Sequence, residues 1–520
     1  MRKVRKTILV TFIMLAALTA GMVWLLKRGS SVSDDLAGKI AQEQSDQNEE
    51  RAYLTEMEHK AKELQMSGEN KNVLNFDSKN FYDTKNSVSA RERLNRVIKR
   101  ITPSFEEPVI AANPFGTNLN SFYFNFKTES PGMVRYTVTV ADQSVPDHVR
   151  YINNGQENNL SKTHEFTVSG LVPGMTNFIV IEVLGSDGNV KKSQVYKYRA
   201  QGASAAVKLS VKKGNSKENI YNGLYFVLPA GNKEIYAYDN SGILRNVTMT
   251  ESAHGRRVYQ SGDSILYQVS DTKVVKVSGI GQVMGTAVVA GYGKIRDFAY
   301  DGYDNVYSLV RKEKRDYVLA TSFQSGKTKV AYTFPKGVQA VSLAMQGGGT
   351  AYIACSAPES IIKLEALTSQ APRVALILGK KSDWKKIPSA KNSWKKKVTK
   401  DKDPVNWQLK NSLLNLVQDR SNGTVDMLST YLLSKEKGTG IVFTVDGKKK
   451  STAINHSFPT GQSSRCSCEV YGGHFLISNF DRGVFAEYDD RGKVTKEFSM
   501  GKAVDAVTKL SLNGMCFYGG

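Results

Sequence analysis

Residues 292–310 read YGKIRDFAYDGYDNVYSLV, two strand-like runs joined by a turn rich in Asp and Gly. The turn has two relatives, AYDNSG at 237–242 and EYDDRG at 487–492. Self-similarity of this kind is typical of architectures in which each repeat is one small sheet. Strands grouped between such turns form units of about 30–45 residues, the size of a four-stranded propeller blade. The units lie near residues 219–250, 256–284, 295–333, 339–378, 409–455 and 464–498.

The sequence therefore predicts a mainly β protein with a six-bladed β-propeller over residues 215–520. We expect the terminal stretch KLSLNGMCFY, 509–518, to add a strand to the first unit and close the ring. Closure would remove the free sheet edges, which are sites of unwanted pairing. An array of β-sandwiches is the alternative architecture, but uneven strand lengths within one contiguous block favour the propeller.

A smaller β domain is predicted before the propeller, over residues 104–201. Four stretches there alternate apolar and polar residues, and turns are expected at Pro131-Gly132, Pro173-Gly174 and Asp187-Gly188. Strands at this spacing suggest a small β-sandwich, and GLVPGMTNFIVIEV at 170–183 is similar to fibronectin type III domains. Such a domain serves either as an adhesive or interface module or as a spacer.

Residues 1–30 carry the pattern of a transmembrane signal anchor. Four of the first six residues are basic, and Lys27 and Arg28 close an uncharged, mostly apolar run over 7–26. Such a run can cross a bilayer of about 30 Å as one helix. A cleavable signal peptide is the alternative, but the apolar run continues past Ala20, the one suitable cleavage point. We expect a single-pass protein of the cell membrane, with its N-terminus cytoplasmic and its bulk extracytoplasmic.

The region 31–103 is polar and is predicted to be a partly helical stalk between the anchor and the sandwich. Its last stretch, RERLNRVIKRI at 91–101, has one apolar helical face. That face either touches an anionic membrane surface or packs against the next domain, and packing is favoured. The apolar residues are Leu94, Val97, Ile98 and Ile101.

A net charge of +22, from 71 Lys and Arg against 49 Asp and Glu, predicts attraction to polyanions. The predicted anchor favours an anionic cell-envelope polymer or lipid headgroups and argues against nucleic acid. The densest basic stretch is the insertion 379–404, with ten lysines and two tryptophans, which we expect over one mouth of the propeller. A solvated, flexible insertion is the alternative. The candidate binding residues are Trp384, Lys385, Lys386, Trp394, Lys395 and Lys396, together with Arg296.

The four cysteines are too few for a disulfide framework, and Cys466-x-Cys468 lacks the spacing of a redox or zinc motif. We expect buried thiols. The stretch DGYDN at 301–305 has calcium-like residues but not the spacing or terminal carboxylate of a calcium loop. We therefore expect no metal and no cofactor.

Five stretches of the chain, taken in order, carry a resemblance to known proteins. They are NPFG at 113–116, GLYFVLPAGNKEIYAYDNSGIL at 223–244, YGKIRDFAYDGYDNVYSLV at 292–310, SIIKLEALTSQAPRVALILG at 360–379 and GVFAEYDDRGKVTKEF at 483–498. Together they resemble the bacterial arylsulfate sulfotransferase family over about residues 104–500. The resemblance implies a small N-terminal β-sandwich followed by a six-bladed propeller, which agrees with the strand pattern.

The chemistry that this resemblance implies is transfer of a sulfuryl group between phenols through a sulfated histidine, without a nucleotide donor. Such a transfer needs a nucleophile, a proton donor for the leaving phenolate, and cationic or hydrogen-bonding groups on the equatorial oxygens. In the family, histidines, one arginine and one asparagine supply these groups from the axial channel of the propeller.

The positions of this chain that match the family's site lack most of those groups. The family's His-Asp segment aligns with residues 295–297, where the aspartate is kept, and its His-Ile-Asn-Ser-like segment aligns with 339–342. Its Ser-Arg pair aligns with 355–356, and its Gln-His nucleophile motif aligns with 408–409. The matching residues are Ile295, Arg296, Asp297, Gln339, Val341, Ser356, Gln408 and Leu409.

None of the six histidines falls at these positions, and we interpret His254 and His456 as solvated loop residues. The sequence therefore favours a catalytically inactive protein with a binding or scaffolding role at the cell envelope. A divergent aryl sulfotransferase is the alternative, with Tyr292, Arg296 and Ser356 as its remaining polar candidates. A homodimer is compatible with either function.

Overall fold

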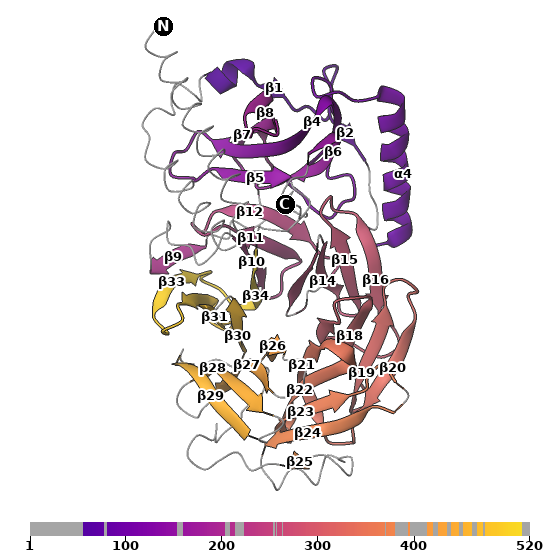
Figure 1. The fold of residues 1–520 in the computed structure, drawn as a ribbon, viewed down its shortest axis with the longest axis vertical. Coiled ribbons are helices and arrows are strands. Elements are labelled where there is room, and N and C mark those ends of the chain that lie inside the picture. Colours follow the sequence, from indigo (N-terminus) through magenta and orange to yellow (C-terminus); the bar gives the residue numbers. More distant parts are fainter. Residues whose placement is uncertain are drawn as a thin grey trace.

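The computed structural model describes most of the chain between residues 56 and 511 as two domains, a β-sandwich and a six-bladed β-propeller (Figure 1). Both domains are those that the strand pattern predicted. The described residues are 56–76, 81–152, 160–202, 209–213, 223–252, 255, 257–262, 264–369, 371–379, 394–395, 413–419, 425–433, 438–446, 451–459, 465–471 and 474–511.

The sandwich is built around one long strand, β4 (Phe122–Val140), that belongs to both of its layers. The first part of β4 pairs with β3 (Val109–Ala112) and β6 (Ser161–Val168). The second part pairs with β5 (His148–Ile152) and β7 (Thr176–Leu184), and β8 (Val190–Arg199) extends that sheet from β7. Aromatic and branched side chains fill the space between the layers, among them Phe124, Tyr136, Phe166 and Ile179.

The turn expected at Pro131-Gly132 is wrong, because both residues lie inside β4. The pairing register of β4 with β6 shifts between Lys127 and Gly132, where the strand passes from one layer to the other. A proline is tolerated at such an interruption of the ladder, since it has no N–H to donate. A Cβ atom at Gly132 would lie 2.5 Å from the side chain of Val183, so the crossing needs glycine. The turns at Pro173-Gly174 and Asp187-Gly188 are confirmed.

The described part of the predicted stalk is instead part of the folded body. The short strands β1 (Lys62–Glu63) and β2 (Leu74–Asn75) pair in parallel with β8 and β3. The helix α4 (Thr84–Ile101) begins at Asp83, whose carboxylate accepts the N–H of Asn86. These residues, which the sequence analysis assigned to a stalk, therefore complete the sandwich and cover its side (Figure 1).

Helix α4 contacts both domains. Leu94 is fully buried against Ala111 and Tyr123 of the sandwich. The N–H of Val283, in the second sheet of the propeller, donates to the hydroxyl of Ser87 at 2.9 Å. The expectation that the apolar face packs against a neighbouring domain is thus confirmed at Leu94, whereas Ile101 is 48% exposed.

The propeller consists of six sheets that the chain forms one after another. The first holds β34 (Val504–Ser511), β10 (Gly223–Pro229), β11 (Glu234–Tyr238) and β12 (Leu244–Met249); the second holds β13 (Val258–Ser261), β14 (Ser264–Ser270), β15 (Lys273–Ser278) and β16 (Val283–Val288). The third holds β17 (Ile295–Tyr300), β18 (Asn305–Lys312), β19 (Arg315–Ser322) and β20 (Thr328–Thr333); the fourth holds β21 (Gln339–Gln346), β22 (Thr350–Ala357), β23 (Glu359–Glu365), β24 (Arg373–Gly379) and β25 (Trp394–Lys395). The fifth holds β26 (Asn415–Asp419), β27 (Val425–Leu433), β28 (Gly438–Asp446) and β29 (Ser451–Pro459); the sixth holds β30 (Cys466–Tyr471), β31 (His474–Asn479), β32 (Val484–Tyr488), β33 (Val494–Ser499) and β9 (Ser210–Lys213).

One strand of each sheet lies on the propeller axis, and we call these six the inner strands. Contacts run from β17 to β21, from β21 to β26, from β26 to β30 and from β30 to β34, so one terminal strand of each of these sheets lies beside that of the next. The inner strands are β34, β13, β17, β21, β26 and β30.

The repeated Asp/Gly turns have the same hydrogen-bonding pattern in three sheets. In each turn the aspartate side chain accepts backbone N–H groups of the residues that follow, as in an Asx turn. Asp239 accepts from residues 241 and 243, and Asp489 accepts from residues 491 and 493. Asp301 accepts from residues 303, 304 and 305. The sequence repeat is therefore a turn signal, and the carboxylate of Asp301 is already engaged by the backbone.

The ring is closed at a contact between the sixth and first sheets that we call the closure seam. β34 pairs antiparallel with β10, which confirms the expected closure for the part of 509–518 that the structure describes. A buried ion pair lies at this seam, with Lys509 Nζ 2.7 Å from Glu487 Oε1. The same ammonium group donates to Asn240 at 2.9 Å and to the hydroxyl of Tyr225 at 3.2 Å.

Two predicted regions fall mainly outside the described residues. The anchor 1–30 lies wholly outside them, and within the described residues no helix has the length and hydrophobicity to span a bilayer. Of the insertion 379–404, the structure describes residue 379 and residues 394–395, and Trp384, Lys385, Lys386 and Lys396 lie outside it. Residues 394–395 form β25, which pairs with the outer strand β24. These two residues therefore lie at the rim of the fourth sheet, and not over the mouth of the propeller as expected.

Candidate functional site

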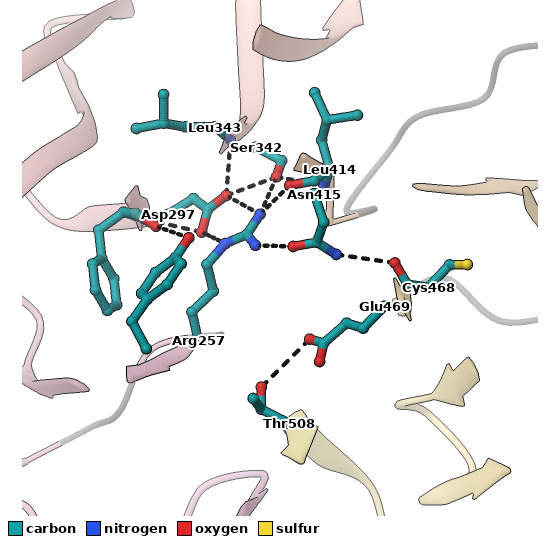
Figure 2. A network of polar contacts seen from close by, with 11 residues as sticks. Arg257, Asp297, Ser342, Leu343, Leu414, Asn415, Cys468, Glu469 and Thr508 are labelled. Carbon is teal, nitrogen blue, oxygen red and sulfur yellow. Dashed lines mark hydrogen bonds and ion pairs between the residues drawn. The ribbon is translucent and has the colours of Figure 1, made fainter. Parts of the chain in front are cut away.

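The six inner strands bring one polar side chain each toward the axis of the propeller (Figure 2). Four of them form one continuous hydrogen-bonded network, and the other two are joined by a separate contact. We call the whole set the axial ring. It consists of Arg257, at the start of β13, with Asp297, Ser342, Asn415, Glu469 and Thr508.

Arg257 and Asp297 form a buried, bidentate ion pair at the centre of this ring. Arg257 Nε lies 2.7 Å from Asp297 Oδ1, and Nη2 lies 3.1 Å from Oδ2. Side-by-side N–H···O bonds of this kind are the strongest contacts that a guanidinium makes with a carboxylate. Asp297 is held from its own side as well, since it accepts the N–H groups of Phe298 and Leu343. The pair therefore ties the second, third and fourth sheets together.

Ser342 and the start of β26 extend the network to the fifth sheet. The hydroxyl of Ser342 donates to Asp297 Oδ2 at 2.7 Å and accepts the N–H of Leu414 at 2.8 Å. Arg257 Nη2 donates to the carbonyl of Leu414 at 2.6 Å, and Nη1 donates to Asn415 Oδ1. The amide of Asn415 then donates to the carbonyl of Cys468 in the sixth sheet at 3.0 Å. We call Arg257, Asp297, Ser342 and Asn415 the clamp.

The electrostatics of the clamp hold Arg257 in its charged form. Burial lowers the pKa of Arg257, but the neighbouring groups together, of which the charge of Asp297 contributes most, outweigh burial and raise the pKa above its ordinary value. The aromatic ring of Tyr259 adds to the same effect, with its centroid 6.0 Å from the guanidinium carbon. Each nitrogen of Arg257 already donates to a protein acceptor. The guanidinium is therefore permanently charged and engaged.

Glu469 lies across the axis from the clamp and has a different environment (Figure 2). It is partly exposed, its Oε2 accepts from the hydroxyl of Tyr471, and its Oε1 lies 3.4 Å from the hydroxyl of Thr508. Burial raises the pKa of Glu469 from 4.5 to about 7, against the opposing effects of the Tyr471 bond and the charge of Arg257. In contrast to Asp297, Glu469 forms no ion pair with any residue that the structure describes.

The residues that match the family's site are separated in the structure. Asp297 alone lies in the axial ring, while Ile295 and Val341 are buried in apolar clusters between sheets. Gln339 is exposed at the first position of β21, and Ser356 is partly exposed near the end of β22. Gln408 and Leu409 lie outside the described residues.

Arg296, proposed as a binding residue and as a remaining catalytic candidate, is directed at another carboxylate. Its Nη1 lies 3.4 Å from Asp316 Oδ2, and Arg311 holds the same carboxylate at 2.6 and 2.9 Å. Asp316 also accepts the N–H of Ala340. Arg296 thus belongs to a structural ion-pair cluster. For the third candidate, Tyr292, the ammonium nitrogen of Lys312 lies 6.0 Å from the centroid of its ring.

Sequence reasoning missed Arg257, Asn415 and Glu469, and it treated Ser342 as part of a degraded motif. A common signal does exist, because each residue lies at the start or in the middle of the first strand of its unit. Reading the same position in all six predicted units would have placed these residues around one axis. Alignment to the family's motifs one at a time could not show it.

The histidines are not part of the axial ring. Among the described residues no inner strand carries one, and His254 lies outside the description. His456 was expected in a loop, but it lies in β29, where its ring packs 4.7 Å from that of Phe475. His148 and His164 are buried in the sandwich, and burial lowers the pKa of His164 to about 4.

The remaining reactive side chains are structural. Cys355, Cys466 and Cys468 are free and buried, as expected, and burial raises the pKa of Cys355 and Cys468 well above the ordinary range. In the part of the chain that the structure describes, no group of three or more His, Cys, Asp or Glu side chains is placed to hold a metal ion.

Comparison with known proteins finds a relationship for the sandwich. Residues 109–201 match the family described as the arylsulfotransferase Ig-like domain. This match supports an arylsulfotransferase relationship for that domain, in agreement with the resemblance seen in the sequence. No curated protein sequence matches the chain.

Solved structures show weak likeness to the chain. A nidogen/laminin complex has a TM-score of 0.36 at 10% identity, covering 55% of this chain and 98% of that one. Dihydro-heme d1 dehydrogenase has a TM-score of 0.33 at 11% identity, covering 61% and 84%. A protein from Lactobacillus plantarum has a TM-score of 0.34 at 12% identity, covering 73% and 100%. These likenesses are too weak to bear on the site.

Proposed function

We propose that this chain is a membrane-anchored, extracytoplasmic protein with arylsulfotransferase-like architecture that binds a partner at the cell envelope and does not transfer sulfuryl groups. One observation carries the proposal. The clamp places a fully engaged Arg257–Asp297 ion pair on the axis, where a sulfuryl acceptor and free cationic donors would be needed.

The chemistry of the clamp does not suit sulfuryl transfer. The developing negative charge on the equatorial oxygens needs donors that are free to turn toward it. The nitrogens of Arg257 are directed at Asp297, Ser342, Leu414 and Asn415, and its charge is neutralised by Asp297. The described inner strands also offer no imidazole as a nucleophile.

The binding role rests on charge. The net charge of +22 and the lysine-rich insertion 379–404 favour an anionic cell-envelope polymer, and the apolar run 7–26 would hold the chain at the membrane. Contacts of this kind weaken as the salt concentration rises, because counterions screen exposed charges.

Two assays on the full chain in neutral detergent test the proposal. The first incubates the chain with a fluorogenic aryl sulfate and a phenol acceptor, and we expect no turnover above the uncatalysed rate. The second measures salt-dependent retention on immobilised cell-wall polymer for the triple variant Lys385→Gln, Lys386→Gln and Lys396→Gln. The matched control removes the same charge from exposed propeller lysines, in the variant Lys314→Gln, Lys327→Gln and Lys336→Gln. Loss of retention confined to the first variant supports the proposal, and equal loss in both contradicts a specific role for the insertion.

A divergent aryl sulfotransferase is the second candidate, and one observation favours it. The axial ring contains an arginine and an asparagine, the residue types that the resemblance implies beside the family's histidines. Glu469, with its pKa of about 7, would be the proton donor in such an enzyme. Turnover in the first assay that is abolished by Glu469→Gln would establish this function and exclude the binding-only role.

A further inference from the structure

The axis of this propeller differs in charge from the rest of the chain. The chain as a whole carries +22, yet the axial ring holds one cation, Arg257, and two carboxyl groups, Asp297 and Glu469. Because Arg257 is neutralised by Asp297, the remaining ionisable group on the axis is Glu469. The region around Glu469 is therefore neutral or negative, depending on whether this carboxyl group is protonated.

Three neighbouring arginines do not offset this. Arg296 and Arg311 share the carboxylate of Asp316. Arg465, which precedes β30, lies 3.0 Å from Asp481 and contacts Asp505 at the start of β34. These cations are occupied by carboxylates of the chain, and none of these arginines is placed as a free anion receptor.

The groups that face Glu469 come from three neighbouring elements. Tyr471 on β30 and Thr508 on β34 offer hydroxyl groups, and Arg257 on the β13 side contributes its distant, paired charge. Tyr259, beside Arg257, and Cys468 are also within electrostatic reach of Glu469, and both are neutral at ordinary pH. Glu469, Tyr471, Asn415 and Tyr259 are each partly exposed to solvent.

The geometry points to the axial ring as a binding site for a ligand that carries a protonated amine, and against the anionic sulfate ester that its relatives' chemistry would require. The ammonium group would donate to the carboxylate of Glu469, which has no counter-ion in the described chain. The hydroxyl groups of Tyr471 and Thr508, which already contact this carboxylate, would lie beside the bound ammonium group. This inference goes beyond the proposed function, in which an anionic polymer binds the insertion 379–404, by naming a second, cationic ligand for the axis.

The expected preference for a cation over an anion follows from the hydrogen bonds that the clamp already makes. A sulfate oxygen needs a donor, and the guanidinium donors of Arg257 are held by the clamp. An ionised Glu469 would repel the anion, and a protonated Glu469 would offer it a single hydroxyl group. An ammonium ion finds a charged acceptor in the same place, and a charge-assisted hydrogen bond is about twice as strong as a neutral one.

Three ligands with the same ring test the inference by isothermal titration calorimetry on the full chain in neutral detergent. They are tyramine, which is a cation, 4-ethylphenol, which is neutral, and 4-ethylphenyl sulfate, which is an anion. We expect tyramine to bind about tenfold or more tightly than 4-ethylphenol, and the sulfate to bind most weakly. Affinity for tyramine should rise with pH as Glu469 loses its proton, and 4-ethylphenol should show no such rise.

Variants identify the residue responsible. Glu469→Gln should abolish the preference for tyramine over 4-ethylphenol, while the control Glu497→Gln on the outer strand β33 should keep it. A preference that survives Glu469→Gln, a preference for the sulfate, or no binding of tyramine by the folded chain would each overturn the inference. The sulfuryl-transfer assay is read separately, so a failure of the proposed inactivity is distinguishable from a failure of the amine site.

Discussion

The clamp and the closure seam both place an ion pair in the interior of the propeller, but they do so with different cations. In the clamp, the guanidinium of Arg257 donates to four residues, and Asp297 together with other neighbouring groups outweighs burial, so that the pKa of Arg257 is raised. In the closure seam, burial outweighs Glu487 and lowers the pKa of Lys509. A guanidinium keeps its charge in the interior, whereas an ammonium ion can lose it.

The carboxylates of the two regions also differ, because the one in the clamp is more fully hydrogen-bonded. Asp297 has both oxygens engaged, whereas Glu487 Oε2 has no hydrogen-bond partner in the described structure. Glu469, beside the closure seam, is bound by hydroxyl groups alone. Four sheets are therefore joined through a guanidinium that stays charged, while the seam contains a lysine with a lowered pKa and lies beside a carboxyl group with a raised one.

Breaking the clamp should have the largest effect. Arg257→Met leaves the buried carboxylate of Asp297 without its counter-ion, and we expect the free energy of unfolding to fall by about 4 kcal/mol. Urea-induced unfolding followed by far-ultraviolet circular dichroism measures this. The matched control is Arg373→Met on the exposed pair with Glu365, which should change stability by less than about 1 kcal/mol. Similar small losses in both variants would show that the clamp does not hold the sheets together.

Breaking the seam should cost somewhat less. Lys509→Met should lower the free energy of unfolding by about 3 kcal/mol, because it leaves the buried carboxylate of Glu487 without its counter-ion. The double variant Lys509→Met, Glu487→Leu should recover much of this loss, since a buried pair replaced by apolar side chains is often nearly neutral. A double variant that is less stable than the single one would contradict this picture of the seam.

The smallest effect should be the pH dependence contributed by Glu469. Its pKa is raised from 4.5 to about 7 in the folded chain, so the folded state binds this proton more tightly than the unfolded state. The stabilisation is fully present below the unfolded pKa and is lost as the pH rises through about 7. We expect stability to fall by about 2 kcal/mol between pH 4.5 and 7.5 from this group, after allowing for its partial exposure.

The control for this pH effect is Glu469→Gln, which should lose this part of the dependence and keep the rest. Thermal unfolding of both proteins at several pH values measures the difference. Parallel pH profiles of stability for the two proteins would show that Glu469 does not contribute to the pH dependence.

The fold was predictable because its signals are local. Asp/Gly turns that recur in three of the units, and strands of alternating polarity, come from backbone chemistry that each segment carries by itself. The turn at Pro131-Gly132 failed for a physical reason, since a proline and a glycine also suit a strand that changes sheets. The placement of α4 against both domains depended on the burial of Leu94 and on the Ser87 contact, which no local pattern records.

The candidate site was less predictable because it is assembled from residues far apart in the chain. Arg257 and Asn415 are separated by 158 positions and meet only when the ring has closed. Asp297 was singled out through the resemblance, but its partner was not, since the motifs were compared one by one. The residue types alone could indicate that imidazole is missing from the matching positions. The ion pair on the axis could be found only from the folded structure, because its two residues come from different sheets.

The central claim is that this propeller binds without forming a sulfated intermediate, and the intact mass of the chain tests it most directly. The full chain in neutral detergent is incubated with an excess of aryl sulfate, without acceptor, and its mass is measured against an untreated sample. We predict that the mass of the chain is unchanged at every pH tested. A gain of one sulfuryl group, mapped to His254 or to any residue of the axial ring, would contradict it.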